Sequence, residues 1–371
     1  MTIWPRFVCL FASLTPCGWY LLTMHVHAAR CCLLGTAVGD AVGLPREGLS
    51  PLRASRLFPN PDRHALLFGR GLLSDDSEHA CMAAQALLTS GGDPDRFERA
   101  LAVRLRSWTL ALPAATGLAT LRAGLKLCAG FGPRRSGVDS AGNGPMMRAP
   151  IIGAAVRDRS RIMPLVRIST RITHTDTRAD DAALLVAIAA HMRANGESIA
   201  PSALSNSVNA VADRPLHTDI LRCLDQVELA VLAGWSAPEF ARQLGLDRGV
   251  SGFALQTLPI VLLAASRAGD NLRAGVLDVI ACGGDTDSTA AIVGGIIGAG
   301  GIESPDDWLR GIIEWPRTPE WIGRLGNLLD SPSVEPIEGI PTVPYPAAVA
   351  RNAIFAAVVL THGFRRLLPP Y

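Results

Sequence analysis

The stretch Cys282–Ala299, CGGDTDSTAAIVGGIIGA, decides the expected fold. Two carboxylates and two hydroxyls, in the segment Asp285–Ser288, open a run that is dominated by Ala, Ile, Val and Gly. A helix that is apolar on every face belongs in a core. Its acidic start then needs a partner, because unpaired buried carboxylates are too costly. Oxygen ligands suit hard divalent cations, so the stretch predicts a buried helix with a metal ion at its start.

A second acidic helix start lies earlier in the chain, at Ser74–Ser77 (SDDS), followed by EHACMAAQALL. Acidic residues in a first turn ordinarily complement the helix dipole. That explanation suits Asp75 better than Asp76, which falls on the apolar face of the helix. If the two starts meet, their carboxylates and hydroxyls exceed the needs of one Mg²⁺ and suit two ions that share a carboxylate. We expect Asp287 to be the shared carboxylate.

Residues 28–43 read as a helix with Gly35, Gly39 and Gly43 on one face. Small residues at this spacing allow another helix to approach closely. Asp40 lies beside the glycines, and its simplest role is to satisfy the terminus of a neighbouring helix. Pro45 should end the helix. Glu47 follows in a loop, where taken alone it reads as a solvated charge.

A glycine-rich loop and a histidine form a further candidate region. Gly142-Asn143-Gly144-Pro145 is a turn sequence whose backbone N–H groups can approach a phosphate, although it matches neither a dinucleotide fingerprint nor a P-loop. His174 precedes the helix 180–193, where a capping or hydrogen-bonding role is the default expectation.

The remaining periodicity is helical throughout, and no segment shows sustained alternation with β-branched residues. We therefore predict an all-α chain with one domain at 28–371. The segment 48–73 reads as irregular, and Pro259 should kink its helix. Further helices are expected at 95–111, 115–129, 146–155, 203–213, 216–232, 236–244, 252–267 and 270–281, with one more in the C-terminal tail.

Composition excludes several function classes. A net charge of +2 without any basic stripe disfavours nucleic-acid binding. The eight Cys form no C-x-x-C pair, so reduced, buried thiols in a cytoplasmic protein are expected. No stretch reaches the length of a membrane span; 288–302 and 353–361 are too short. We expect a monomer without membrane or nucleic-acid partners.

Residues 1–27 form an N-terminal extension. Met24 lies just before the first helix, which favours a translation start placed too early. The apolar segment FVCLFASL and the triplet Val26-His27-Ala28 keep a secretory signal as the alternative.

The ordered motifs resemble the ADP-ribosylglycohydrolase family, which includes dinitrogenase reductase-activating glycohydrolases and ADP-ribosyl-acceptor hydrolases. The matching pieces are Gly39–Gly43 with Glu47, Ser74–Ser77, Gly142–Gly144 leading to Met147-Arg148, Thr173-His174, and Gly283–Ser288. The resemblance runs from about residue 28 to the C-terminus, and the tail NAIFAAVVLTHGFRRLLPPY is similar to that of many bacterial members.

The resemblance implies an orthogonal all-α fold with two Mg²⁺ or Mn²⁺ ions in a cleft, and hydrolysis of the bond between ADP-ribose and an acceptor protein side chain or small molecule. Glu47 matches the catalytic Glu proposed for some members, and Asp76 is the second candidate base. The implied metal ligands are Ser74, Asp75, Asp76, Asp285, Asp287 and Ser288. The implied substrate-binding residues are Ser140, Gly142, Asn143, Gly144 and His174.

Two departures from the family pattern stand out. Ala141 lies where some members have an aromatic residue, and serines replace both threonines of the T-D-D-T pattern. Ser74 and Ser288 can still coordinate through their hydroxyls. Two alternatives remain open: a catalytically silent module that binds ADP-ribose or nucleotides, which retention of every matched carboxylate disfavours, and a two-metal phosphoester hydrolase.

Overall fold

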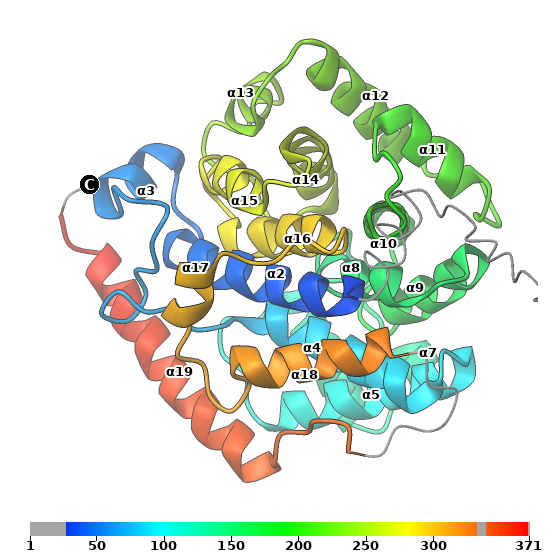
Figure 1. Ribbon diagram of the computed structural model, residues 1–371. Helices are drawn as coiled ribbons and strands as arrows, with labels where there is room; N and C mark the ends of the chain where they lie inside the picture. Colours follow the sequence, from blue (N-terminus) through cyan, green and yellow to red (C-terminus); the bar gives the residue numbers. More distant parts are fainter. Residues whose placement is uncertain (1–26, 332–338, 370–371) are drawn as a thin grey trace, which may run out of the picture.

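The computed structural model describes residues 27–331 and 339–369, which form a multi-helix assembly (Figure 1). Among these residues there is no β-strand, and only isolated bridges join extended segments. The all-α fold expected from the sequence is therefore confirmed. The expected extension at 1–27 lies outside the described residues except for His27.

The elements follow one another as α-helices with short 3₁₀ turns between some of them. In chain order they are α2 (Ala28–Gly43), η1 (Leu44–Arg46), α3 (Pro51–Leu57), α4 (Asp75–Ser90), α5 (Pro94–Leu110), α6 (Leu118–Cys128), α7 (Pro133–Ser136), η2 (Met146–Arg148), α8 (Ala149–Ala155), η3 (Arg159–Arg161), α9 (Ile162–Arg171), α10 (Thr177–Ala194), α11 (Pro201–Asn209), α12 (Thr218–Leu232), α13 (Ala237–Gln243), α14 (Ala254–Ala268), α15 (Leu272–Ile280), α16 (Thr286–Gly298), α17 (Asp306–Gly311), α18 (Pro319–Asp330) and α19 (Tyr345–Arg366).

Helices α2 and α16 lie side by side at the centre of the molecule (Figure 1). Every residue of α16 is buried, as expected for a helix that is apolar on all faces. The glycines of α2 face α16, because a Cβ placed on Gly39 would stand 2.1 Å from the carbonyl oxygen of Ala290. A Cβ on Gly35 would meet the carbonyl oxygen of Gly294 at 2.2 Å. The predicted close approach of a second helix to this glycine stripe is confirmed.

Gly35 lies against Gly294 and Gly43 against Thr286, so the two central helices are antiparallel. The end of α2 therefore meets the start of α16, where the Thr286 hydroxyl donates to the carbonyl of Gly43 at 2.9 Å. Asp40 connects the start of α4 to the same place. Its carboxylate accepts the backbone N–H groups of Ser74 at 2.9 Å and Ser77 at 3.2 Å. The expectation that Asp40 satisfies a neighbouring helix terminus is confirmed, and three helix ends meet at one point.

Several elements differ from the sequence expectations. The stretch 48–73, expected to be irregular, contains the short helix α3. Helices α9, α17 and α18 were not anticipated. Pro259 lies inside α14, and the kink expected there stays a prediction. Six of the eight cysteines lie in the described residues and all six are free thiols, five of them buried.

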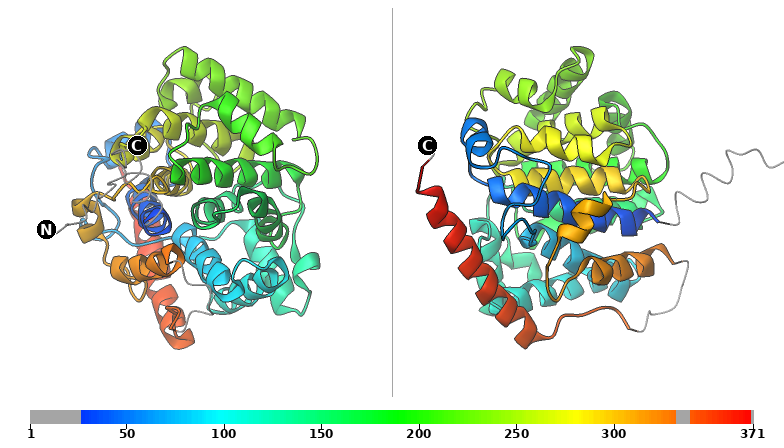
Figure 2. Two further views of the ribbon diagram at one scale, coloured as in Figure 1. Left: turned by 45° about the vertical axis from the view of Figure 1, so that its right-hand side comes forward. Right: turned by 60° about the vertical axis from the view of Figure 1, so that its left-hand side comes forward.

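Helix α19 runs along the outside of the molecule (Figures 1 and 2). By length and composition it is the one described helix that could cross a membrane, and 17% of that segment is buried. This helix is longer than the apolar segment 353–361 that was judged too short from the sequence, because it begins at Tyr345 and ends at Arg366. Two buried polar side chains attach it to the domain. Arg351 pairs with Glu314 at 2.8 Å, and Asn352 donates to the carbonyl of Ala111 at 2.8 Å.

Candidate active site

The two acidic helix starts meet directly. Asp76, in the first turn of α4, accepts a hydrogen bond from the Ser288 hydroxyl, in the first turn of α16, at 3.0 Å. The same carboxylate oxygen accepts the hydroxyl of Ser74, the N-cap of α4, at 3.1 Å. These residues are more than two hundred positions apart in the sequence, and the antiparallel packing of the central helices brings them together. The convergence that the sequence predicted is therefore present.

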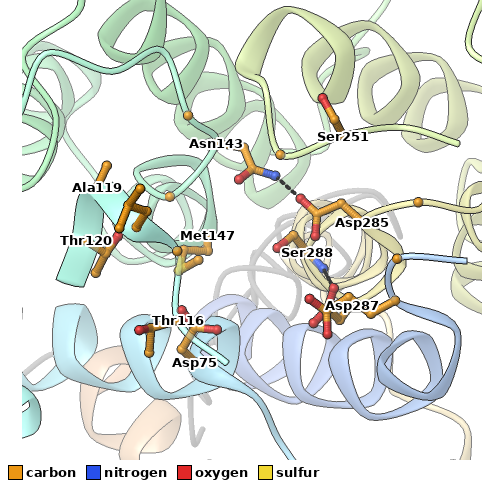
Figure 3. A pocket seen from close by; sticks show the side chains of 18 of the residues that line it. Asp75, Thr116, Ala119, Thr120, Asn143, Met147, Ser251, Asp285, Asp287 and Ser288 are labelled. Atoms are coloured by element: carbon orange, nitrogen blue, oxygen red, sulfur yellow. Dashed lines mark hydrogen bonds between the residues drawn. The ribbon is translucent and has the colours of Figure 1, made fainter. Parts of the chain in front are cut away.

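A pocket of about 760 Å³ opens in front of this junction. Figure 3 shows Asp75 facing Asp285, Asp287 and Ser288 across it. Of the predicted site residues, ten line the pocket: Glu47, Asp75, Ser140, Gly142, Asn143, Gly144, His174, Asp285, Asp287 and Ser288. Ser74 and Asp76 do not line it and lie behind its wall, each 1% exposed.

Glu47 reaches the pocket from the loop that follows α2. It is half-buried, which differs from the solvated loop charge that its neighbours in the sequence indicate. Gly48, with a positive φ of 72°, donates its N–H to the carbonyl of Gly284 at 2.7 Å. This backbone contact places Glu47 beside the residues that begin α16.

The charges that act most strongly on the acidic side chains are those of other carboxylates. Burial, together with the charges of Asp75, Asp40 and Asp285, raises the pKa of Asp76 well above its usual range. Burial and the neighbouring Glu47 and Asp285 do the same to the pKa of Asp287. For Glu47, burial raises the pKa to about 7; Asp285 adds to the rise, and the positive charge of Arg366 opposes it. No Arg or Lys forms an ion pair with the site carboxylates in the part of the chain that the structure describes.

The donor set fits a divalent cation. The Oδ1 atom of Asp76 is buried without a hydrogen-bond partner, so this carboxylate has an unused oxygen that faces no protein donor. Carboxylates and serine hydroxyls are the hard ligands that Mg²⁺ and Mn²⁺ prefer. Within the described ranges, no three His, Cys, Asp or Glu side chains are gathered tightly enough to hold an ion by themselves.

The glycine loop forms the opposite wall of the pocket. Asn143 donates through Nδ2 to Asp285 at 2.7 Å (Figure 3). The same amide group donates to Thr257 at 3.1 Å. Gly142 and Gly144 border the His174 imidazole, and a Cβ on Gly144 would stand 2.8 Å from it. The loop therefore needs glycine at these positions to accommodate the ring.

His174 lines the pocket and does not cap α10, whose N-cap is Asp176. Its Nδ1 lies 2.9 Å from the Thr173 hydroxyl, so the default expectation of a hydrogen-bonding histidine holds. Burial, aided by the charge of Arg148, lowers the pKa of His174 to about 3. The imidazole is therefore neutral near pH 7.

Arg148 supports this histidine from the core. The fully buried guanidinium donates to the Thr173 hydroxyl at 2.8 Å and to the Ser169 carbonyl at 3.0 Å. It also contacts His79 Nδ1 at 2.8 Å. The resemblance included Arg148 in a motif without giving it a role, and the structure makes it the support of Thr173.

Two stretches of the pocket rim were missed in the sequence. One joins α5 to α6 and the other precedes α14. The first contains Ala115–Gly117 and continues into the first turn of α6 as far as Thr120, and the second contains Arg248–Gly252. Val250 accepts the backbone N–H of Asp285 at 2.7 Å, so the second stretch holds the start of α16 through main-chain atoms. In the sequence, only Gly249 and Gly252 indicate a turn in this stretch.

The chain is similar to known proteins in both sequence and fold. A sequence profile of the ADP-ribosylglycohydrolase family matches residues 24–335. An uncharacterized protein of Archaeoglobus fulgidus is 32% identical over 303 residues, covering 76% of this chain and 90% of its own length. The ADP-ribosylhydrolase ARH3 of Homo sapiens is 27% identical over 210 residues, covering 48% of this chain and 56% of its own length.

A solved structure described as an ADP-ribosylglycohydrolase-related protein complex superimposes with a TM-score of 0.61 at 25% identity. The match covers 82% of this chain and 98% of that one. The acidic helix starts, the glycine loop and the matched profile agree, and the chain belongs to the ADP-ribosylglycohydrolase family.

Proposed function

We propose that this protein is a metal-dependent hydrolase that cleaves the glycosidic bond between ADP-ribose and an acceptor, thereby reversing ADP-ribosylation. The acceptor is a protein side chain or a small molecule. The observation that carries the proposal is the hydrogen bond between Ser288 and Asp76, which joins two acidic helix starts beside a pocket lined by Glu47. Family membership supports the general reaction class.

Two Mg²⁺ or Mn²⁺ ions, when bound, would supply positive charge that orients the hydroxyls of the distal ribose. The chain offers three oxygen-bearing side chains at each helix start to hold them: Ser74, Asp75, Asp76, Asp285, Asp287 and Ser288. Asp287 lines the pocket and is strongly affected by the other carboxylates, which suits the proposed role of a shared ligand.

Glu47 is the proposed general base. A base works best when its pKa lies near the operating pH, and the pKa of Glu47 is raised to about 7. It accepts a proton from water while the water oxygen bonds to the anomeric carbon. The bond to the acceptor breaks, and its electron pair leaves on the acceptor atom, which takes up a proton. Asp76 is the second candidate base, but it lies behind the pocket wall.

The opposite wall suits the diphosphate and distal ribose. We propose that the loop containing Gly142, Asn143 and Gly144 follows this part of the substrate, together with Ser140. The neutral imidazole of His174 contributes a hydrogen bond rather than a charge. Asn143, held by Thr257 and Asp285, connects this wall to the acidic one.

The test is incubation of the purified protein with ADP-ribosylated arginine and serine peptides, with Mg²⁺ or with EDTA. Free ADP-ribose should appear only with Mg²⁺ and should be lost in Asp287→Ala. Asp225→Ala, which removes an exposed carboxylate of α12, is the matched control and should keep full activity. Binding of ADP-ribose without release from any acceptor would identify a silent binding module. Mg²⁺-dependent cleavage of a phosphoester bond, without release of free ADP-ribose, would identify a phosphoester hydrolase.

A further inference from the structure

The C-terminal helix α19 contacts the main-chain segments that carry the site, although it begins beyond residues 24–335, where the family profile matches. Figure 2 shows it as one long helix against the side of the molecule. Near its start, the guanidinium of Arg351 donates to the carbonyl of Leu73, the residue before Ser74. Glu314, the ion-pair partner of Arg351, accepts the Leu73 N–H at 3.0 Å. One end of α19 thus supports the start of α4.

The other end of α19 supports the Glu47 loop. Arg366 donates through one guanidinium nitrogen to the carbonyl of Glu47 at 2.6 Å and through the other to the carbonyl of Pro45 at 3.0 Å. His362, one turn earlier, also lies within hydrogen-bond distance of the Pro45 carbonyl, at 2.9 Å. The Arg366 side chain is half-buried and does not line the pocket, so it acts on Glu47 from behind.

The carbonyls that Arg366 contacts most closely belong to Pro45 in η1 and to Glu47, the C-cap of η1. The last carbonyls of a helix have no N–H partner within it, and a cationic side chain satisfies them well. On its other side, the same short loop is fixed by the hydrogen bond from the Gly48 N–H to the carbonyl of Gly284. The peptide that carries the Glu47 side chain is therefore held between α19 and the residue before Asp285.

We propose that Arg366 is a positioning residue for Glu47, so that the catalytic geometry depends on α19, a helix beyond the residues that the family profile matches. The inference rests on the proposed function in one respect, the role of Glu47 as the base. A displacement of about 1 Å in a catalytic group can cost roughly a hundredfold in rate. Loss of Arg366 removes the side-chain donor to the Glu47 carbonyl and leaves only His362 on the Pro45 carbonyl, which allows such a displacement.

The activity test compares Arg366→Ala, Arg366→Lys and Arg365→Ala in the full chain. Arg365 is exposed on the neighbouring position of the same helix and donates only to the carbonyl of Pro369 among the described contacts, so its variant is the matched control. We expect Arg366→Ala to lower kcat by about ten- to a hundredfold, with ADP-ribose affinity unchanged within about twofold. Arg366→Lys should recover part of the rate, and Arg365→Ala should match the wild type. An unchanged kcat in Arg366→Ala, or a loss of affinity equal to the loss of rate, overturns the proposal.

A second readout does not depend on activity. Amide hydrogen exchange of the segment 44–49 should quicken in Arg366→Ala and stay at the wild-type rate in Arg365→Ala, because the loop loses its anchor only in the former. Unchanged exchange in Arg366→Ala overturns the positioning role even if activity falls. If the wild type releases no ADP-ribose from any acceptor, the proposed function fails, and the exchange result still decides whether Arg366 holds this loop.

Discussion

Glu47 is half-buried where the loop after α2 meets the first residues of α16. Replacing it with Gln keeps the shape of the side chain and removes the group that accepts a proton. General acid–base groups contribute about 10²- to 10⁴-fold to rates, so Glu47→Gln should lower kcat by that range while the affinity for ADP-ribose persists. Single-turnover release from an ADP-ribosylated peptide, together with calorimetric binding of ADP-ribose, measures the two effects separately. Glu228→Gln, on the exposed face of α12, is the control.

Normal turnover in Glu47→Gln would transfer the role of base to Asp76. A loss of ADP-ribose binding would instead make Glu47 a structural or ligand-contacting residue.

Gly144 borders the His174 imidazole so closely that a methyl group has no room. A Cβ there would stand 2.8 Å from the ring and 3.2 Å from the Thr120 hydroxyl. The His174 ring cannot turn away without losing its hydrogen bond to the Thr173 hydroxyl, which Arg148 holds in place. Gly144→Ala should therefore weaken ADP-ribose binding by about tenfold or more, equivalent to about 1.4 kcal/mol.

The control for Gly144 is Gly132→Ala, because a Cβ at Gly132 has open space and the residue lies at the start of α7. Isothermal titration of ADP-ribose into both variants measures whether Gly144→Ala alone weakens binding. Equal affinities for the two variants would show that the His174 ring does not contact the ligand.

At the scale of elements, the contact between α2 and α16 sets the position of every acidic residue in the site. A Cβ on Gly39 would lie 2.1 Å from the oxygen and 2.5 Å from the carbon of the Ala290 carbonyl. Backbone atoms cannot change rotamer, so the two helices must separate. Overpacking of this kind typically costs about 1–3 kcal/mol, and Gly39→Ala should lower the free energy of unfolding by at least that amount.

Chemical denaturation of Gly39→Ala and Gly363→Ala tests this contact. Gly363 lies in α19 with open space around its Cα, so its substitution should stabilise the helix by up to about 1 kcal/mol. A Gly39→Ala variant as stable as the wild type would mean that α2 and α16 can move apart without cost.

The helices with long apolar periods were predictable, whereas α3, α9, α17 and α18 were not. Helix α16 was clear because all its faces are apolar, and α2 was clear because its glycines repeat. Helix α3 has only seven residues, too few for two helical repeats. Helix α9 carries Pro164 in its first turn, where proline is compatible with a helix but reads as a break.

For the site, the sequence predicted the acidic helix starts because carboxylates beside an apolar run conflict with burial. The rim at Arg248–Gly252 and the support from Arg366 were not predictable from local pattern. Both act through hydrogen bonds to or from main-chain groups of segments far away in the sequence. Nearly every residue has the same main-chain groups, so the sequence does not show which residues accept or donate such hydrogen bonds.

At the scale of the whole molecule, the site concentrates negative charge inside a nearly neutral protein. Burial raises the pKa of Glu47 to about 7 and that of Asp40 to about 6, against ordinary values near 4. The pKa values of Asp75, Asp76 and Asp287 are also raised by burial and mutual repulsion. Repulsion between these groups therefore destabilises the folded protein most when they are ionised and no cation is bound.

The sign of the resulting pH dependence follows from proton binding. Between about pH 4 and pH 7 the unfolded chain has already lost protons that the folded protein still holds, so the free energy of unfolding falls as pH rises. In EDTA the melting temperature should therefore decline across this window, and Mg²⁺ should restore more stability at pH 7 than at pH 5. Asp287→Asn removes one of the charges, so it should flatten the decline in EDTA and reduce the gain from Mg²⁺. Subtracting the Asp287→Asn curve from the wild-type curve cancels the contribution of carboxylates elsewhere. Equal Mg²⁺ gains at both pH values, or the same gain in Asp287→Asn, would show that these carboxylates are not the ligands of the ion.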